Sequence, residues 1–210
     1  MSCAYLDNGF NLGAVRQTQK NLVALYREDM VKHADDRALQ VKAIYDSIPA
    51  QLDKENRRFK LYLSDVGMLM SQYKTDVALA ALAGELKVNF GGIYENVVAQ
   101  ELATWGVPFH YYHHTKLGEV DFIGEAGSKV LPIGVKSGKD YRRHVALNNL
   151  LRFDEYGIEF AYMLSESNVS TEIREGKPVR YLPLYMLPLV ARELSRGSLD
   201  GIAAEPPVWE

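Results

Sequence analysis

The hydrophobic pattern of the first half of the chain is helical. Between residues 12 and 34 the apolar side chains recur at spacings of three, four and seven, with charged residues between them. Asp35 and Asp36 interrupt this pattern and predict the cap of a second helix that ends or kinks near Ile48, because the residue before Pro49 avoids the α region. A short strand or turn followed by a helix with Asp65 as its cap is predicted over residues 61–73, and further helices over 76–86 and 91–105.

The second half alternates between strand and helix patterns. Strands are predicted over residues 109–113, 119–123, 131–139 and 158–164, with a hairpin over 169–180 that turns at Glu175 and Gly176. Helices are predicted over 141–156, capped by Asp140 and closed by Gly157, and over 183–196. A strand, a helix and a strand in succession predict a right-handed crossover. We therefore predict an α/β domain with a mixed central β-sheet flanked by helices, preceded by a helical N-terminal extension.

Composition narrows the class of protein. The 210 residues are 47% hydrophobic, which is enough for one core plus a helical extension. A formal net charge of -3 excludes a wholly basic nucleic-acid coat protein, so any nucleic-acid contact is expected to be local. The single Cys3 excludes an internal disulfide, and no apolar run reaches the roughly 18 residues that a membrane span requires. With no signal-peptide pattern, we expect a cytoplasmic protein without a membrane partner.

Charged residues of opposite sign lie near the ends of two predicted neighbouring strands. Glu119 and Asp121 share one face of the first strand, and Gly134 and Lys136 share one face of the second, because strand side chains alternate. A carboxylate and an ammonium in this position are the usual parts of a metal-dependent site that cleaves phosphodiesters. Glu95, on the predicted helix that Gly91 opens, lies on or beside the buried stripe and adds a second acid.

These residues resemble the PD-(D/E)XK nuclease superfamily. Segments 60–69, 91–99, 118–122 and 132–139 look more closely like the domain of unknown function that follows an AAA-type ATPase module in many bacterial and archaeal proteins. The resemblance implies a restriction-endonuclease-like core. It divides the chain into a helical extension at 1–59 that resembles a post-ATPase linker, a nuclease-like domain at 60–190 and a tail at 191–210.

In such enzymes two carboxylates and a backbone carbonyl hold Mg²⁺, and a lysine stabilises the developing charge. Residue by residue, the resemblance implies catalytic roles for Lys136, Asp121 and Glu95. It implies metal ligation by Asp121, Glu95 and the Val135 carbonyl, with Glu119 as a substitute acid. Where the family usually has Glu, this chain has Gly134. This departure predicts a degenerate or weak Mg²⁺-dependent DNA endonuclease.

A basic run follows the second strand. Lys139, Arg142 and Arg143 are candidate contacts to a nucleic-acid phosphate backbone, and the alternative is an ordinary solvated face. Lys136 and His144 extend the same run. His110, His113 and His114 do not favour a metal site, because the first two face opposite sides of a strand.

The chain contains no Gly-x-x-x-x-Gly-Lys-Ser/Thr loop, so no ATP binding is expected. It looks like a family member without the ATPase and winged-helix parts. An ATPase partner is therefore expected, and helix faces left exposed by such a fusion would allow a homodimer.

Two functional readings stay open. The first is an Mg²⁺-dependent nuclease that cuts DNA, favoured by the retained Glu95, Asp121 and Lys136. The second is a non-catalytic module that binds DNA or a protein partner, favoured by Gly134. The enzyme reading requires Glu95, Asp121 and Lys136 to converge.

Overall fold

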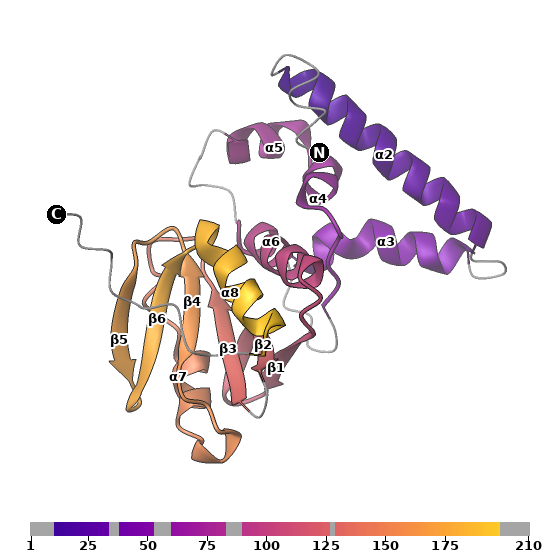
Figure 1. Ribbon diagram of the computed structural model, residues 1–210. Helices are drawn as coiled ribbons and strands as arrows, with labels where there is room; N and C mark the ends of the chain where they lie inside the picture. The colour runs from indigo at the N-terminus through magenta and orange to yellow at the C-terminus, as the bar shows by residue number, and fades with distance from the viewer. Residues whose placement is uncertain (1–10, 34–37, 53–59, 83–89, 127–128, 198–210) are drawn as a thin grey trace. The chain divides into compact units, whose positions relative to one another are not determined.

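The computed structural model describes residues 11–33, 38–52, 60–82, 90–126 and 129–197 (Figure 1). The chain forms two compact units, Met1–Asn96 and Val97–Glu210. The boundary between them lies inside the helix α6, Gly91–Thr104. The divisions predicted after residues 59 and 190 stay a prediction.

The first unit is helical in its described part, as predicted. Its helices before α6 are α2 (Leu12–His33), α3 (Ala38–Leu52), α4 (Val66–Gln72) and α5 (Thr75–Leu82). Asp65 caps α4 as expected, because its carboxylate accepts a hydrogen bond of 2.9 Å from the Met68 amide. The buried core joins residues of α2, α3, α4, α6 and the segment before α4: Val23, Tyr45, Ile48, Leu63, Met68, Leu69 and Ile93.

Of the two alternatives predicted near Ile48, an end of the helix is wrong, and a kink stays a prediction. α3 continues through Pro49 to Leu52. Tyr45 and Ile48 are both buried in the core of the first unit, and this packing holds the helix across a residue that removes one backbone hydrogen bond. The predicted cap at Asp35 and Asp36 and the end of the helix predicted over 76–86 lie outside the described residues.

The second unit is built on a mixed six-stranded sheet with the order β1-β2-β3-β4-β6-β5. The strands are β1 (Phe109–His114), β2 (Gly118–Ala126), β3 (Lys129–Val135), β4 (Ala161–Ser165), β5 (Ser170–Arg174) and β6 (Lys177–Pro183). β3, β4 and β6 are parallel, and the other neighbouring pairs are antiparallel. The predicted α/β class with a mixed sheet, flanking helices and an N-terminal helical region is confirmed.

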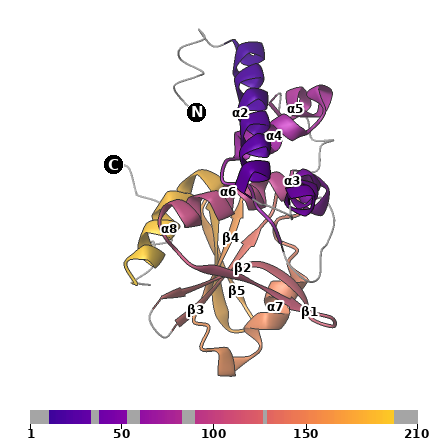
Figure 2. The same cartoon turned by 90° about the vertical axis from the view of Figure 1, so that its right-hand side faces the viewer.

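Helices α7 (Val145–Leu151) and α8 (Leu187–Ser195) lie on opposite faces of this sheet (Figure 1, Figure 2). Two glycines of β2 mark the two faces. A Cβ on Gly118 would lie 2.7 Å from Cβ of Ala146 on α7, whereas a Cβ on Gly124 would lie 3.2 Å from the Leu194 side chain of α8. The core on the α7 face comprises Val120, Leu147, Leu150, Leu151, Ile158, Ala161, Met163, Val179 and Tyr181.

The helix predicted over residues 141–156 is much shorter than expected. Residues 140–143 form a turn closed by the Arg143 amide and the Asp140 carbonyl, so Asp140 does not cap a helix. α7 begins only after His144, whose φ of −137° and ψ of 69° are not helical. After α7 a single 3₁₀ turn, η2 (Asp154–Tyr156), ends at Gly157, whose φ of 61° is left-handed.

The remaining connections agree with the predicted pattern. The β5–β6 hairpin turns through Glu175 and Gly176, both with positive φ, and the last helical stretch consists of η3 (Leu184–Met186) and α8. Among the helices of the described ranges, none is both long enough and apolar enough to cross a bilayer.

Candidate functional site

A row of three residues crosses the α7 face of the sheet from the expected nuclease position. Gly134 of β3 is paired with Met163 of β4, and Met163 is paired with Tyr181 of β6. We call this the Gly134–Tyr181 row. At about 4.8 Å between strands, its ends lie roughly 10 Å apart.

Met163 covers Gly134, the position at which the resemblance implied a second acid. A Cβ on Gly134 would lie 2.5 Å from Met163 Cε and 3.1 Å from Sδ. Gly134 is buried, and Met163 is 1% exposed within the apolar cluster under α7. A carboxylate at residue 134 would therefore meet a thioether and an apolar core.

Asp121 and Val135 are brought together as the resemblance implied, but through a different group. The Asp121 Oδ2 accepts a hydrogen bond of 2.8 Å from the Val135 amide. One carboxylate oxygen is thus directed to the backbone of β3, just where β2 and β3 stop pairing after Phe122 and Ile133. The contact seen at Val135 uses its N–H, and a ligating role for its carbonyl stays a prediction.

The other two predicted acids have partners of their own. Glu119 is paired with His113 of β1, and its Oε2 lies 3.7 Å from the His113 Nδ1. Glu95 belongs to the first unit, where its Oε2 lies 2.9 Å from Lys60 Nζ and accepts a hydrogen bond of 3.3 Å from the Tyr62 hydroxyl. Its side chain is 18% exposed, so the expected position beside the buried stripe is confirmed.

Lys136 does not belong to the strand as predicted. β3 ends at Val135, and Lys136 is exposed beyond it, with its amide donating a hydrogen bond of 2.8 Å to the Leu164 carbonyl. A buried ion pair between Asp121 and Lys136 is therefore excluded. The convergence of these two residues with Glu95, which lies in the other unit, stays a prediction.

The residues around Asp121 do not fit an Mg²⁺ site. Mg²⁺ requires near-octahedral oxygen ligands and is usually anchored by one or two carboxylates. Here one acid is replaced by a glycine under Met163, and Asp121 already accepts a backbone hydrogen bond. Within the described ranges no group of three or more His, Cys, Asp and Glu side chains could hold a metal ion.

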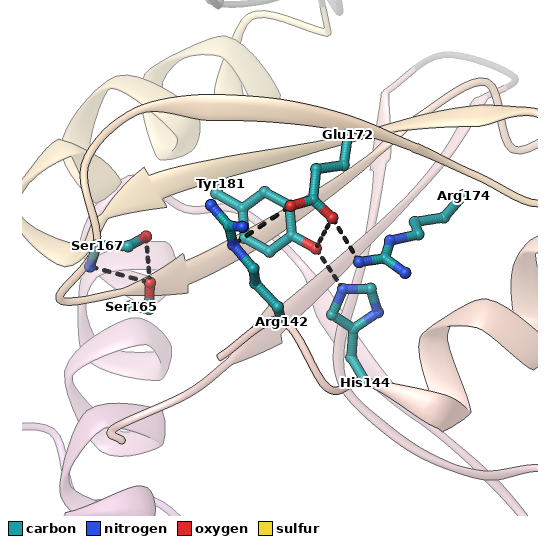
Figure 3. Close-up of polar contacts among 7 residues, drawn as sticks. All are labelled: Arg142, His144, Ser165, Ser167, Glu172, Arg174 and Tyr181. Atoms are coloured by element: carbon teal, nitrogen blue, oxygen red, sulfur yellow. Dashed lines mark hydrogen bonds and ion pairs between the residues drawn. The ribbon is translucent and has the colours of Figure 1, made fainter. Parts of the chain in front are cut away.

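A polar cluster occupies the other end of the Gly134–Tyr181 row (Figure 3). The Tyr181 hydroxyl lies 2.6 Å from His144 Nε2 and 3.4 Å from Glu172 Oε2. Arg174 donates a short hydrogen bond to the same Glu172 oxygen, and Arg142 Nε lies 3.3 Å from Glu172 Oε1. We call these five residues the Tyr181 cluster. A separate pair, Ser165 and Ser167, is joined by a hydrogen bond of 2.7 Å after β4.

Two strands and one loop position the cluster. Glu172 and Arg174 are two residues apart on the edge strand β5 and therefore lie on the same face of it. β5 pairs antiparallel with β6. The loop after β3 brings Arg142 and His144, and the buried His144 holds this loop against Tyr181. This anchoring also explains why the helix starts late, since His144 is held in a non-helical conformation.

The environment sets the charges in the cluster. Burial, together with the charge of Arg174, lowers the pKa of His144 below its ordinary value of 6.5. Burial also opposes ionisation of Glu172, but the hydrogen bond from Arg174 and the charges of Arg174 and Arg142 outweigh it and lower the pKa of the carboxyl. Burial and the nearby Glu172 raise the pKa of Tyr181. At neutral pH the cluster therefore holds a neutral imidazole, a neutral phenol and a carboxylate between two guanidinium groups.

A pocket of about 480 Å³ opens beside the Tyr181 cluster. Most of its lining is basic or polar, and it comes from the loop before α7, the start of α7 and the end of β5. The lining residues are Lys139, Asp140, Arg142, Arg143, His144, Val145, Asn148 and Arg174. The three predicted phosphate-binding residues, Lys139, Arg142 and Arg143, are thus brought together around one concave site.

Sequence reasoning missed Glu172, Arg174 and Tyr181. The alternation of Glu172 and Arg174 on a predicted hairpin strand placed both on one face, but their pairing with a loop 30 residues earlier left no local signal. His144 was grouped with the basic run, for which a solvated face and a phosphate contact were both open, and a solvated position is wrong for this residue because it is 5% exposed. Its position next to apolar Val145 and Leu147 was the available hint of burial.

The fold and the site define an α/β domain with a mixed sheet and a basic pocket on one face. Residues 90–186 match the family described as Domain of unknown function (DUF4143), so a DUF4143 domain lies in this part of the chain. The match includes all six strands of the sheet, the loop before α7 and the Tyr181 cluster. No curated protein and no solved structure matches the chain.

Proposed function

We propose that the sheet unit is a nucleic-acid-binding domain with a restriction-endonuclease-like fold that holds phosphates without cutting them. The observation that carries this proposal is the basic pocket beside the Tyr181 cluster. Lys139 and Arg143 are exposed on its loop, and phosphate oxygens are the groups that such cations recognise on nucleic acids.

Met163 supports the non-catalytic side of the proposal. With its thioether over Gly134, the face where the second metal-binding acid would lie is filled by an apolar side chain. The polar cluster of this face lies instead at Tyr181, two strands away from Gly134. We also propose that the domain is related to the domains that follow AAA-type ATPases. The ATPase partner, the homodimer and the cytoplasmic location stay predictions.

Binding is tested with the full chain and a fluorescent DNA duplex by anisotropy at several salt concentrations. The double variant Lys139→Ala/Arg143→Ala should bind at least tenfold more weakly. It should also reduce the slope of log K against log salt by about two, because about one unit is lost for each phosphate contact. The matched control, Lys129→Ala/Arg192→Ala, removes the same two charge types from exposed positions outside the pocket lining. Equal weakening by both pairs would show unspecific attraction and contradict the site.

Cutting is tested separately with a supercoiled plasmid and Mg²⁺ or Mn²⁺. The unmodified chain should leave the plasmid intact. Cleavage that disappears in Lys136→Ala would overturn the non-cutting proposal and establish the enzyme reading.

A further inference from the structure

The basic pocket has an excess of positive charge, because the carboxylates in and beside its lining are fewer than its cationic side chains. Its four cationic side chains face the carboxylates of Asp140 and Glu172, which leaves two uncompensated positive charges. The cations are Lys139, Arg142, Arg143 and Arg174. An internal phosphodiester carries one negative charge, whereas a phosphate monoester is close to doubly charged at neutral pH, since its second pKa is about 6.

His144 supplies an independent sign of a ligand. It is 5% exposed, lines the pocket, and its Nδ1 has no hydrogen bond within the ranges that the structure describes. Buried polar atoms are rarely left unpaired, because the lost hydration is costly. Oδ1 of Asn148, one helical turn further on, also has no hydrogen bond in the described ranges. Burial lowers the pKa of His144, but the Asn148 side chain interacts with the imidazole and acts to raise that pKa, so it is the acceptor that a ligand would have to replace.

The contacts of Tyr181 indicate which proton His144 offers. Tyr181 has one hydroxyl proton for two contacts: His144 Nε2 at 2.6 Å, whose role depends on the tautomer, and Glu172 Oε2 at 3.4 Å, a carboxylate oxygen that can only accept. The shorter contact fits an O–H donor better than an N–H donor. With Nε2 accepting from Tyr181, the neutral ring carries its proton on Nδ1. The pocket therefore contains a buried neutral N–H donor among guanidinium and ammonium groups.

We propose that this pocket binds a phosphate monoester, the phosphorylated end of a nucleic-acid strand, in preference to an internal phosphodiester. The inference rests on the proposed function for its nucleic-acid source. A terminal phosphate enters a concave site end-on and presents three free oxygens, whereas an internal phosphate presents two and is flanked by ester links on both sides. Arg143 and Lys139 bind the outer oxygens, and His144 Nδ1–H donates to the deepest one.

The experiment compares one single-stranded DNA 12-mer with a 5′ phosphate, with a 3′ phosphate, and with hydroxyl groups at both ends, using the full chain and anisotropy. The chain should bind one phosphorylated form at least tenfold more tightly than the hydroxyl form. Arg143→Ala and His144→Gln should each abolish this preference, whereas the control Arg152→Ala, exposed and outside the pocket lining, should preserve it.

Two further tests do not depend on whether His144→Gln folds. Arg143→Ala changes an exposed residue, and the imidazole ¹⁵N resonances of His144 are measured in the unmodified chain. The Nδ1 resonance of His144 should shift on titration with the phosphorylated 12-mer and stay in place with the hydroxyl form. A phosphorylated strand that binds without moving it overturns the assigned contact.

The outcomes separate this inference from the proposed function. If all three 12-mers bind equally and Lys139→Ala/Arg143→Ala weakens all of them, the nucleic-acid function stands and the end-recognition inference is overturned. If no 12-mer binds but ribose 5-phosphate shifts the His144 resonance, the monoester site stands and its nucleic-acid source is overturned. If neither the strands nor ribose 5-phosphate binds, both are overturned.

Discussion

At the scale of single residues, Gly134 and Met163 decide what the nuclease-like position can do. The sequence alone identified Gly134 as a missing acid, because the surrounding Asp121, Val135 and Lys136 matched a known pattern. It did not identify Met163, which is 29 residues away and reaches Gly134 only through the parallel pairing of β3 and β4. Packing between neighbouring strands is a tertiary property, so no local pattern could have predicted it.

Substitutions at Gly134 should destabilise the protein more as the inserted side chain becomes larger or charged. Gly134→Ala should lower the free energy of unfolding by about 1–3 kcal/mol, because its Cβ overlaps the Met163 side chain unless that chain moves. Gly134→Glu should cost more, since it also buries an unpaired charge. Urea denaturation measures both.

A glycine with free space provides the matched control. Gly138 is exposed, and a Cβ there would meet nothing within 4 Å, so Gly138→Ala should change the unfolding free energy by less than about 0.5 kcal/mol. If Gly134→Ala proved as neutral as Gly138→Ala, Met163 would not be the barrier that the distances indicate.

At the scale of elements, two aspartates show which helix starts can be predicted from sequence. Asp65 was expected to cap α4 and does so, because the apolar residues after it are buried in register with the cap. Asp140 was expected to cap a helix and does not, because buried His144 is held by Tyr181 in a non-helical conformation. Local capping signals thus succeed where the core agrees with them and fail where a tertiary contact fixes the chain.

The Asp65 cap should be measurable by itself. Asp65→Ala removes the acceptor for the Met68 amide and should destabilise the start of α4 by about 1 kcal/mol. Exchange of the Met68 amide with deuterium should then accelerate about fivefold. Asp65→Asn keeps an acceptor oxygen and should leave this rate nearly unchanged; acceleration as large as that of the alanine variant would exclude the cap as the cause.

At the scale of the whole molecule, the sequence predicted the class of fold and most strands, since alternation and turn residues are local. The β5–β6 hairpin, its turn at Glu175 and Gly176, and the parallel β3–β4 pair all agree. The Tyr181 cluster was not predicted, because it unites β5, β6 and a loop that is far from both in sequence. The net charge of -3 predicted that any nucleic-acid contact is local; the structure contains a local basic pocket, and its contact with nucleic acid stays a prediction.

Global stability should fall in acid in two steps that the Tyr181 cluster determines. Folding lowers the pKa of His144 below 6.5, so the unfolded chain binds more protons below that pH. The free energy of unfolding is therefore at its full value above pH 6.5, where the His144 ring is neutral in both states, and it decreases as the pH falls toward the pKa of His144 in the folded state. Folding also lowers the pKa of Glu172 below 4.5, which adds a second loss below that pH. Urea denaturation between pH 8 and about 3 should show both declines.

Two variants identify the residue behind the first decline. His144→Gln should flatten the stability profile between pH 7 and 5.5, because the titrating ring is gone. His110→Gln, at an exposed position of β1, should keep the decline. A profile that stays equally steep in His144→Gln would assign the loss to another group.

The thioether over Gly134 has a consequence for how this chain could be turned into a nuclease. Adding the acid alone forces it against Met163, and shortening Met163 alone leaves a void in the core without adding chemistry. Each single change is therefore a loss, and only the two together open space for an oxygen ligand. An engineer, or natural selection acting one substitution at a time, would therefore have to pass through a less stable protein before an acid could be placed at residue 134.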